Sequence, residues 1–475
     1  MRKWLTVENS FVAAGLVIVA ALLLTETFVG VADNGDFLRI MGSIGLNYYM
    51  EEPFEDRFFN YAHSLFAYDT FFRGFYPSTQ LLLVFAARCI GYVLNSEAFD
   101  IRVLGAIYAA LLLTAGFVLV RLVRRRSAAA GVVLALLLLF VFFDIGYLAY
   151  FNSLFGEPTA MVSLLLTMAL GLYVTAQERP SRMALLLFFA AVLFLIGSKT
   201  QNAPVGVGFA LLFLSYARLR EDKPWRRLAL VLSAFTLVVS VGVYVFAPKD
   251  FKDINTYQTV FFGILKDSPD VEGDLKELGL PQRLSVLADT NYFQAGTAIK
   301  QDDPSLKADF YDRISHGDVL LFYAKHPGRL LAKLEYAAEH GMMIRPYYLG
   351  NYEKAAGKPP GAMSFAFSGW SEFKKRSLPN ELWLIALFFG LYGAAAVWEW
   401  TRRKDRRSRT AIELFVLLGL TGMFSFVIPI LGDGVADLAK HLFLFNAVFD
   451  MMAVSAVVWV VYRGSRFIGG KRGSQ

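Results

Sequence analysis

Cysteine, histidine and charge are all scarce in this sequence. Cys89 is the only cysteine among 475 residues, which excludes an intramolecular disulfide. Five histidines do not predict a site built from several histidines, and we expect neither a bound metal nor a cofactor. Charged residues make up 18% of the chain, against about 25% in an average soluble protein. Walker, Rossmann, heptad and internal-repeat patterns are missing, so the sequence does not predict a nucleotide-binding or coiled-coil protein.

What the sequence has instead is long apolar runs. Hydrophobic residues make up 56% of it, and its mean hydropathy is +0.46. The first run, residues 11–31, exceeds the about 20 helical residues that cross a hydrocarbon core and lacks the cleavage site of a signal peptide. The net charge of +7 requires no nucleic acid, because basic residues in short loops are typical of the cytoplasmic side of membrane proteins. The lipid bilayer is therefore the expected partner.

The basic clusters predict the topology. They should all face the cytoplasm, and they lie at residues 1–3, 121–126, 178–182, 218–227, 401–409 and 462–473. If every apolar segment crossed the membrane, the clusters from 121–126 onward would face the wrong side. The pattern is consistent if residues 76–94, which contain Pro77 and Arg88, form a juxtamembrane or re-entrant helix on the outer side.

The predicted fold class is thus an all-α polytopic membrane protein with about ten transmembrane helices. We expect residues 1–247 to form a transmembrane module with a long first external loop at 32–77. Residues 248–380 should form a mostly helical external subdomain, in which 326–340 has amphipathic helical spacing. Residues 381–475 should add the C-terminal transmembrane helices. Long loops of this kind tend to be functional.

Polar side chains gather where the predicted helices meet the outer surface. Five separate junctions carry acids, bases and amides, whereas the cytoplasmic ends show only the arginines expected there. The residues at these junctions are Asp33, Asp36 and Arg39; Arg102; Asn152 and Glu157; Lys199, Gln201 and Asn202; and Asp433, Asp437, Lys440 and His441.

Each of these residues also has an ordinary structural interpretation. Asp33 alone is typical of a solvated loop, whereas Asn34–Gly35 predicts a turn that points Asp36 back toward the membrane. Glu157 suits a helix N-terminus, and Lys199 suits a snorkelling lysine. Arg102 can pair with a loop acid, and His441 can be an interface histidine. Their location on one side of the membrane favours a shared site.

The apolar segments themselves contain few ionisable residues, with Asp144 and Arg88 as the main exceptions. Transporters and pumps keep ionisable residues and broken helices near the midplane. We therefore expect a site at the outer interface, with a lipid that carries a polar head as its substrate. If the head is a sugar on a phosphate, a carboxylate can act as general base, and lysine or arginine can stabilise the departing phosphate.

The arrangement resembles the GT-C superfamily of integral-membrane glycosyltransferases, with an acidic first loop (NGDFLR), a juxtamembrane segment (76–94) and a second acidic motif (YFNSLFGEP). More narrowly, NGDFLRIMG, FNSLFGEP and SKTQNAP resemble the WsfD-like bacterial hexose transferases of glycan biosynthesis. The resemblance covers roughly residues 1–220. The doubled acid of some relatives is split here as D-N-G-D, so either Asp33 or Asp36 can be the base. The chain is similar to the metal-independent members.

The resemblance implies transfer of a hexose from a polyprenyl-phosphate donor to a glycan acceptor, on the outer face of the bacterial cytoplasmic membrane. The alternatives are a lipid-linked sugar flippase or exporter, a non-catalytic partner in envelope assembly, and a glycan polymerase or ligase. Under the first reading the expected catalytic residues are Asp36, Asp33 and Glu157; the phosphate-binding residues are Arg102, Lys199, Arg39 and His441; and the sugar- or acceptor-binding residues are Asn152, Gln201, Asn202 and Asp437.

Overall fold

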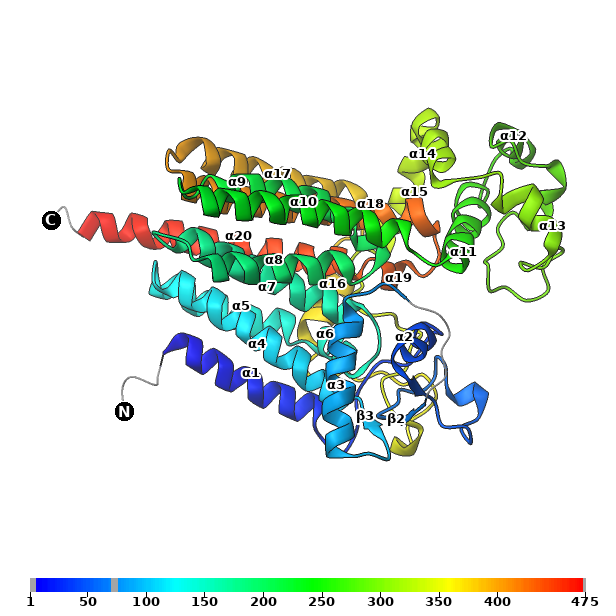
Figure 1. Cartoon of the computed structure of the whole chain (residues 1–475), viewed down its shortest axis with the longest axis horizontal. Helices are drawn as coiled ribbons and strands as arrows, with labels where there is room; N and C mark the ends of the chain where they lie inside the picture. Colours follow the sequence, from blue (N-terminus) through cyan, green and yellow to red (C-terminus); the bar gives the residue numbers. More distant parts are fainter. Residues whose placement is uncertain (1–5, 70–75, 473–475) are drawn as a thin grey trace.

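A bundle of long helices forms one part of the computed structural model, and smaller lobes cover the bundle end that lies opposite the two chain termini (Figure 1). We call this end the distal end. The structure describes residues 6–69 and 76–472, with side chains as far as 467. The basic residues at 1–3, residues 70–75 near the end of the predicted first loop, and the end of the basic tail lie outside the described residues.

The bundle helices follow the apolar runs of the sequence. Several begin with a side-chain cap at the end near the termini: Thr6, Ser127, Ser181, Asp222 and Asp405 each accept a hydrogen bond from a backbone N–H of the first turn. The helices are α1 (Val7–Leu23), α4 (Arg102–Arg124), α5 (Ala128–Phe142), α7 (Glu157–Ala176), α8 (Arg182–Gly197), α9 (Val205–Ala217), α10 (Lys223–Val245), α17 (Leu382–Arg402), α18 (Arg406–Asp433) and α20 (Phe443–Arg472).

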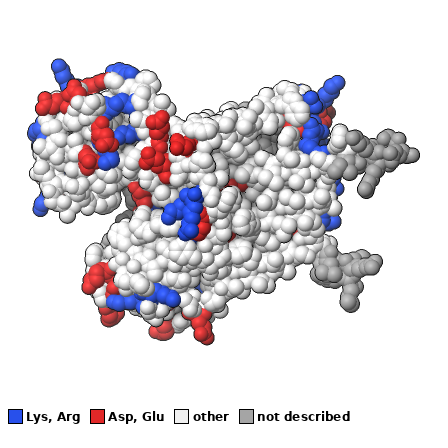
Figure 2. All heavy atoms as spheres, turned by 180° about the vertical axis from the view of Figure 1, so that it is seen from behind, with Lys and Arg blue, Asp and Glu red and all other residues white. Residues whose placement is uncertain are grey.

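These helices are those of a multi-pass membrane protein. Six in the described ranges are long and apolar enough to cross a membrane, or seven if Ala128–Phe142 and the bent continuation Ile145–Asn152 form one span. Three shorter apolar helices, α1, α8 and α9, lie among them, so helix length alone does not confirm the predicted count of about ten. Charged side chains gather at both ends of the molecule, and the flank between them is almost free of charge (Figure 2).

Helix α3 (Gln80–Leu94) lies within the segment that was predicted not to span. It is a shorter apolar helix and runs across the distal end of the bundle rather than along it (Figure 1). Its surface exposes Leu82, Phe85 and Val93. Arg88 reaches out of this helix to the carbonyl of Gly45, at 3.4 Å, so it does not lie in the apolar interior.

Two acids inside apolar segments have structural partners. Asp144 lies at the bend before α6 (Ile145–Leu148) and accepts backbone hydrogen bonds from Gly146 at 2.7 Å and from Trp370 and Ser371 at 2.9 Å. It therefore caps both α6 and α16 (Gly369–Ser377). The second acid, Asp450 in α20, was missed among the sequence exceptions.

Asp450 is fully buried and forms an ion pair of 2.6 Å with Lys374 of α16, which is also fully buried. The hydroxyl of Tyr147 and the indole N–H of Trp370 donate to the same carboxylate at 2.6 and 2.7 Å. The charge is thus compensated on all sides, and the pair connects α16 to the bundle.

The distal end also holds a small antiparallel sheet that the all-α prediction did not include. Its order is β1 (Leu46–Asn47), β2 (Leu65–Tyr68) and β3 (Phe99–Asp100). A segment from the C-terminal half closes over this loop: Val29 forms a bridge with Tyr352, and Gly30 N–H donates to Asn351 O at 2.9 Å.

The predicted external subdomain of residues 248–380 has two parts with different packing. Residues 249–326, which we call the distal lobe, enclose their own hydrophobic core, whereas residues 344–374 pack on the first loop and the bundle. The amphipathic helix expected at 326–340 is confirmed as α15. Besides α16, the helices of this segment are α11 (Lys249–Thr259), α12 (Val271–Glu277), α13 (Pro304–Leu306), α14 (His316–Lys325) and α15 (Pro327–Glu339). Two further short helices, α2 (Phe37–Ile44) and α19 (Leu438–His441), lie outside it.

Short 3₁₀ and π turns complete the connections. They are η1 (Phe54–Asp56), η2 (Ala149–Asn152), η3 (Thr200–Asn202), η4 (Val260–Ile264), η5 (Gln282–Leu287), η6 (Lys307–Tyr311) and η7 (Lys354–Ala356).

We predict that the buried pair between α16 and α20 is required for stability. Lys374→Met leaves the Asp450 carboxylate without its counter-charge and should cost about 3–5 kcal/mol, measured as a lower thermal midpoint in detergent. The double variant Lys374→Met/Asp450→Asn removes both charges and should recover much of the loss. Arg376→Gln, which breaks a pair whose arginine is 74% exposed, is the control. A single variant as stable as the wild type would contradict the prediction.

Candidate functional site

The D-N-G-D turn after α1 gives its two acids different surroundings. Asp33 is 1% exposed, and its Oδ1 accepts the N–H groups of Gly35 at 2.8 Å and Phe37 at 3.0 Å. Its Oδ2 accepts the hydroxyl of Tyr48 at 2.9 Å. Gly35 has φ +103°, which favours glycine. Asp33 therefore shapes the turn and the start of α2. Burial raises the pKa of Asp33 to about 6, although the N–H donors lower it.

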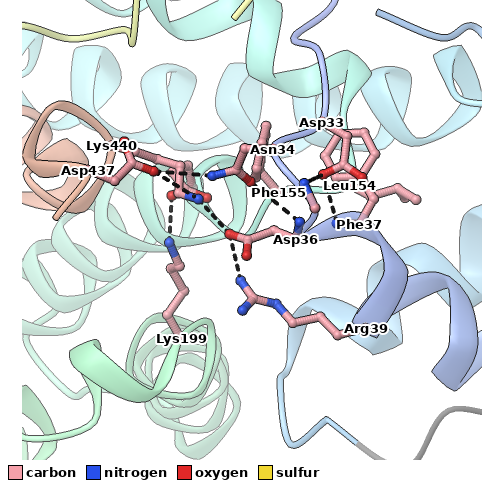
Figure 3. Close-up of polar contacts among 12 residues, drawn as sticks. Asp33, Asn34, Asp36, Phe37, Arg39, Leu154, Phe155, Lys199, Asp437 and Lys440 are labelled. Carbon is pink, nitrogen blue, oxygen red and sulfur yellow. Dashed lines mark hydrogen bonds and ion pairs between the residues drawn. The ribbon is translucent and has the colours of Figure 1, made fainter. Parts of the chain in front are cut away.

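Asp36 leaves the same turn in the opposite direction, toward two cations (Figure 3). Its Oδ2 lies 2.6 Å from Lys440 Nζ and 2.9 Å from Arg39 Nη2. Burial alone would raise the pKa of Asp36, but Arg39, Lys440 and Lys199 together hold it well below its usual range. The carboxylate is thus ionised and surrounded by positive charge.

Lys440 lies in α19, and 404 positions of sequence separate it from Asp36. It is 3% exposed at its side chain and also lies 3.4 Å from Asp437. Asp437 accepts hydrogen bonds from Asn34 Nδ2 at 3.2 Å and from the hydroxyl of Tyr348. Its backbone has φ +45°, a left-handed conformation that is strained for aspartate. The sequence placed Lys440 at an outer junction but gave it no role, and Tyr348 had no motif to reveal it.

Glu157 and Lys199 form the second half of the cluster. Glu157 Oε1 and Lys199 Nζ lie 2.6 Å apart, with side chains only 2% and 9% exposed. Among the described residues, Glu157 Oε2 is buried and has no hydrogen-bond partner. Gln80 of α3 donates to the carbonyls of Leu154 and Phe155 at 2.7 Å and so fixes the loop that presents Glu157. We call Asp36, Arg39, Glu157, Lys199, Asp437 and Lys440 the distal cluster.

His441 and Gln201 lie beside this cluster and tie η3 to α19. His441 Nδ1 is 3.0 Å from Gln201 Oε1, and its Nε2 is 3.0 Å from Asp433. Gln201 Nε2 donates to the carbonyl of His441 at 3.1 Å. Asn202 donates to Ser198 Oγ at 2.9 Å and supports the same turn.

Arg102 and Asn152 are placed differently. Arg102 pairs with Asp100 at 3.2 Å and lies over the ring of Phe28. Asn152 donates to the carbonyls of Leu23 and Val29, which ties the end of α1 to the bundle. Within residues 6–69 and 76–467, neither side chain contacts the distal cluster through a hydrogen bond or ion pair, so their binding roles remain predictions.

The cluster is chemically balanced. Three carboxylates (Asp36, Glu157 and Asp437) face three cations (Arg39, Lys199 and Lys440). Among the described residues, no group of three or more His, Cys, Asp or Glu side chains could hold a metal ion. This arrangement suits an anionic ligand that competes for the cations.

Fold and site together define a multi-pass helical membrane protein with a largely buried acid–base cluster at one end of its bundle. The chain belongs to the family described as the YfdI N-terminal transmembrane domain, whose model matches residues 2–472. No curated protein matches the sequence.

The solved structures that are similar to this chain include two of the oligosaccharyltransferase of Archaeoglobus fulgidus. The apo form shares 12% identity at a TM-score of 0.39, and the form in complex with an inhibitory peptide and a dolichol-phosphate shares 13% at 0.40. Each match covers 97% of this chain and 52% of the other, so the chain spans about half the length of these proteins.

We predict a pH dependence of stability that originates at Asp33. Its carboxyl keeps a proton to about pH 6 in the folded chain but only to about pH 4 when unfolded. Its contribution to stability is therefore fully present below about pH 4 and is lost as the pH rises to about 6, by up to about 3 kcal/mol. Thermal midpoints of the wild type and Asp33→Asn across this range give the difference. Parallel curves for the two proteins would disprove the assignment.

Proposed function

We propose that this protein is a GT-C-type glycosyltransferase that moves a hexose from a polyprenyl-phosphate donor to a cell-surface glycan. The reaction would occur at the outer face of the bacterial cytoplasmic membrane, where the distal end would lie. The observation that carries the proposal is Asp36, a half-buried carboxylate among Arg39, Lys199 and Lys440. A carboxylate can take a proton from a hydroxyl, and adjacent cations can stabilise a phosphate leaving group.

The position of the cluster supports a lipid-linked substrate. It lies where α2, α7 and α19 meet at the distal end, and Gln80 connects it to α3. The exposed apolar side chains of α3, including Leu82, Phe85 and Val93, offer a surface for a prenyl tail. A phosphate beside the cluster would thus sit at the boundary between apolar and polar surroundings.

The reaction follows from the placement of the groups. An acceptor hydroxyl attacks the anomeric carbon and forms a new carbon–oxygen bond, while its proton passes to Asp36. The bond from the anomeric carbon to the phosphate oxygen breaks, and the polyprenyl phosphate leaves with the electron pair. Attack opposite the phosphate inverts the anomeric centre. The free oxygen of Glu157 would accept a hydroxyl of the sugar.

The ion pairs also suggest how the base becomes active. Lys440 and Arg39 lower the proton affinity of Asp36 when no donor is present. A donor phosphate between the cations would draw them toward its own oxygens and so raise the basicity of Asp36. Asp33 cannot serve in the same way, because three hydrogen-bond donors already occupy its oxygens. This favours Asp36 as the base.

We predict that Asp36→Asn abolishes transfer, because the amide cannot accept the proton. A transfer assay with purified protein in nanodiscs, a panel of labelled polyprenyl-phosphate hexoses and envelope glycan should show a loss of at least about 10²-fold, the scale of general-base catalysis. Glu272→Gln, an exposed acid on α12, is the matched control. Full activity of Asp36→Asn would eliminate the base assignment. Donor carried across the membrane without transfer would favour a flippase.

We predict that Lys440 binds the donor phosphate. Lys440→Met should raise the donor KM by about tenfold or more, and Lys440→Arg should restore part of the affinity. Removing this cation also raises the pKa of Asp36, so the acid limb of the pH–rate profile should move to higher pH.

Lys276→Met, an exposed lysine on α12, serves as the control for loss of a positive charge. A purely structural Lys440 would lower the amount of folded enzyme and leave both the donor KM and the pH limb unchanged, and that result would refute the role.

A further inference from the structure

A cavity of about 290 Å³ opens in the distal lobe, outside the distal cluster. Its lining includes Asp250 and Asp253 of α11 together with Tyr292, Gln301 and Tyr311. Its volume is close to the lower limit of about 300 Å³ for small-molecule pockets. The cavity can therefore hold a short segment of a larger polar ligand.

Two tyrosine side chains that line the cavity are fixed by their neighbours. Tyr292 packs edge-on against Tyr257 at 5.5 Å, and the hydroxyl of Tyr311 donates to the carbonyl of Gln301 at 3.2 Å. Both rings are thus held in place. Among the described residues, neither the Asp250 nor the Asp253 carboxylate accepts a hydrogen bond or forms an ion pair, so both are available to donors from a ligand.

The charges that line the cavity limit the kinds of ligand that it can bind. Four aspartates (Asp250, Asp253, Asp302 and Asp303) line the cavity against two lysines (Lys249 and Lys307). This excess of negative charge disfavours an anionic polymer. Tyrosine faces suit the C–H surfaces of a sugar ring, and carboxylates accept hydrogen bonds from sugar hydroxyls. The chemistry fits a neutral saccharide.

Helix α11 connects this cavity to the distal cluster. Phe251, between the two aspartates in sequence, lies 4.9 Å from the guanidinium carbon of Arg39, the partner of Asp36. Tyr76 packs on Phe251 at 5.5 Å and also lies under Arg39. The cavity and the cluster are therefore separated by about one helix diameter, ~10 Å. Figure 1 shows α11 between the rest of the distal lobe and α19.

We propose that the cavity binds a neutral sugar segment of the acceptor glycan and positions the next sugars of that chain at Asp36. The proposal rests on the proposed function for the acceptor's identity, but the binding itself does not require transfer. It makes the distal lobe the part of the protein that selects the acceptor.

Direct binding tests this. The full chain in nanodiscs, without donor, is titrated calorimetrically with neutral oligosaccharides released from surface glycan and with an acidic, uronate-containing oligosaccharide. We expect the neutral probe to bind more tightly. The double variant Asp250→Asn/Asp253→Asn and the single variant Tyr311→Ala should each weaken it at least about tenfold, and the former should raise the acceptor KM in the transfer assay. Glu272→Gln should match the wild type.

The outcomes separate the two proposals. Neutral-probe binding that these variants abolish, with no transfer from any donor, would uphold the cavity and refute the proposed function. Transfer with unchanged acceptor KM and probe affinity in the variants would refute the cavity site. Binding of calcium but not of saccharide, lost in Asp250→Asn/Asp253→Asn, would also overturn it. Circular dichroism of each variant confirms that the helices are retained.

Discussion

The partly buried ion pair between Asp36 and Lys440 is the interaction on which the distal end depends. It joins the first loop to a short helix before the last one, across a sequence separation of 404 residues. Two charges out of water are stabilising only with close geometry and further partners. Arg39 and Asp437 provide these partners, and Asn34 and Tyr348 then hold Asp437 in its strained backbone conformation. A substitution in any of these groups changes the charge balance of the whole cluster.

The contrast between the two acids of the first loop shows how geometry divides similar residues into different tasks. Both carboxylate oxygens of Asp33 accept hydrogen bonds from backbone N–H groups or a tyrosine hydroxyl, and these bonds stabilise the turn. Within the part of the chain that the structure describes, the Asp36 carboxylate has no backbone donor and faces cations. The same contrast separates the distal cluster from the Lys374–Asp450 pair, which is fully buried and saturated by Tyr147 and Trp370. Charged groups whose hydrogen-bonding positions are all occupied stabilise the fold. Glu157 differs, because one of its oxygens has no partner among the described residues and can accept a hydrogen bond from a ligand.

Much of the architecture was predictable because it follows from hydropathy and charge. Apolar runs located the bundle helices, Pro77 and the basic loops separated α3 from them, and the turn Asn34–Gly35 distinguished Asp36 from Asp33. Three features were not predictable for physical reasons. The strands β1–β3 are too short for a period-two pattern. Asp450 sits in an apolar run, and its partner Lys374 is distant in sequence. The link from Lys440 to Asp36 depends on helix packing that no local pattern encodes.

The separation between Asp36 and Lys440 also has a consequence for biosynthesis. At the usual ribosomal rate, the separation of 404 positions takes roughly 20 to 80 seconds to synthesise. Throughout this interval the Asp36 carboxylate lacks the lysine with which it later pairs. The cluster forms only when the final helices insert. Insertion of α20 thus completes both the fold and the charge balance of the distal cluster.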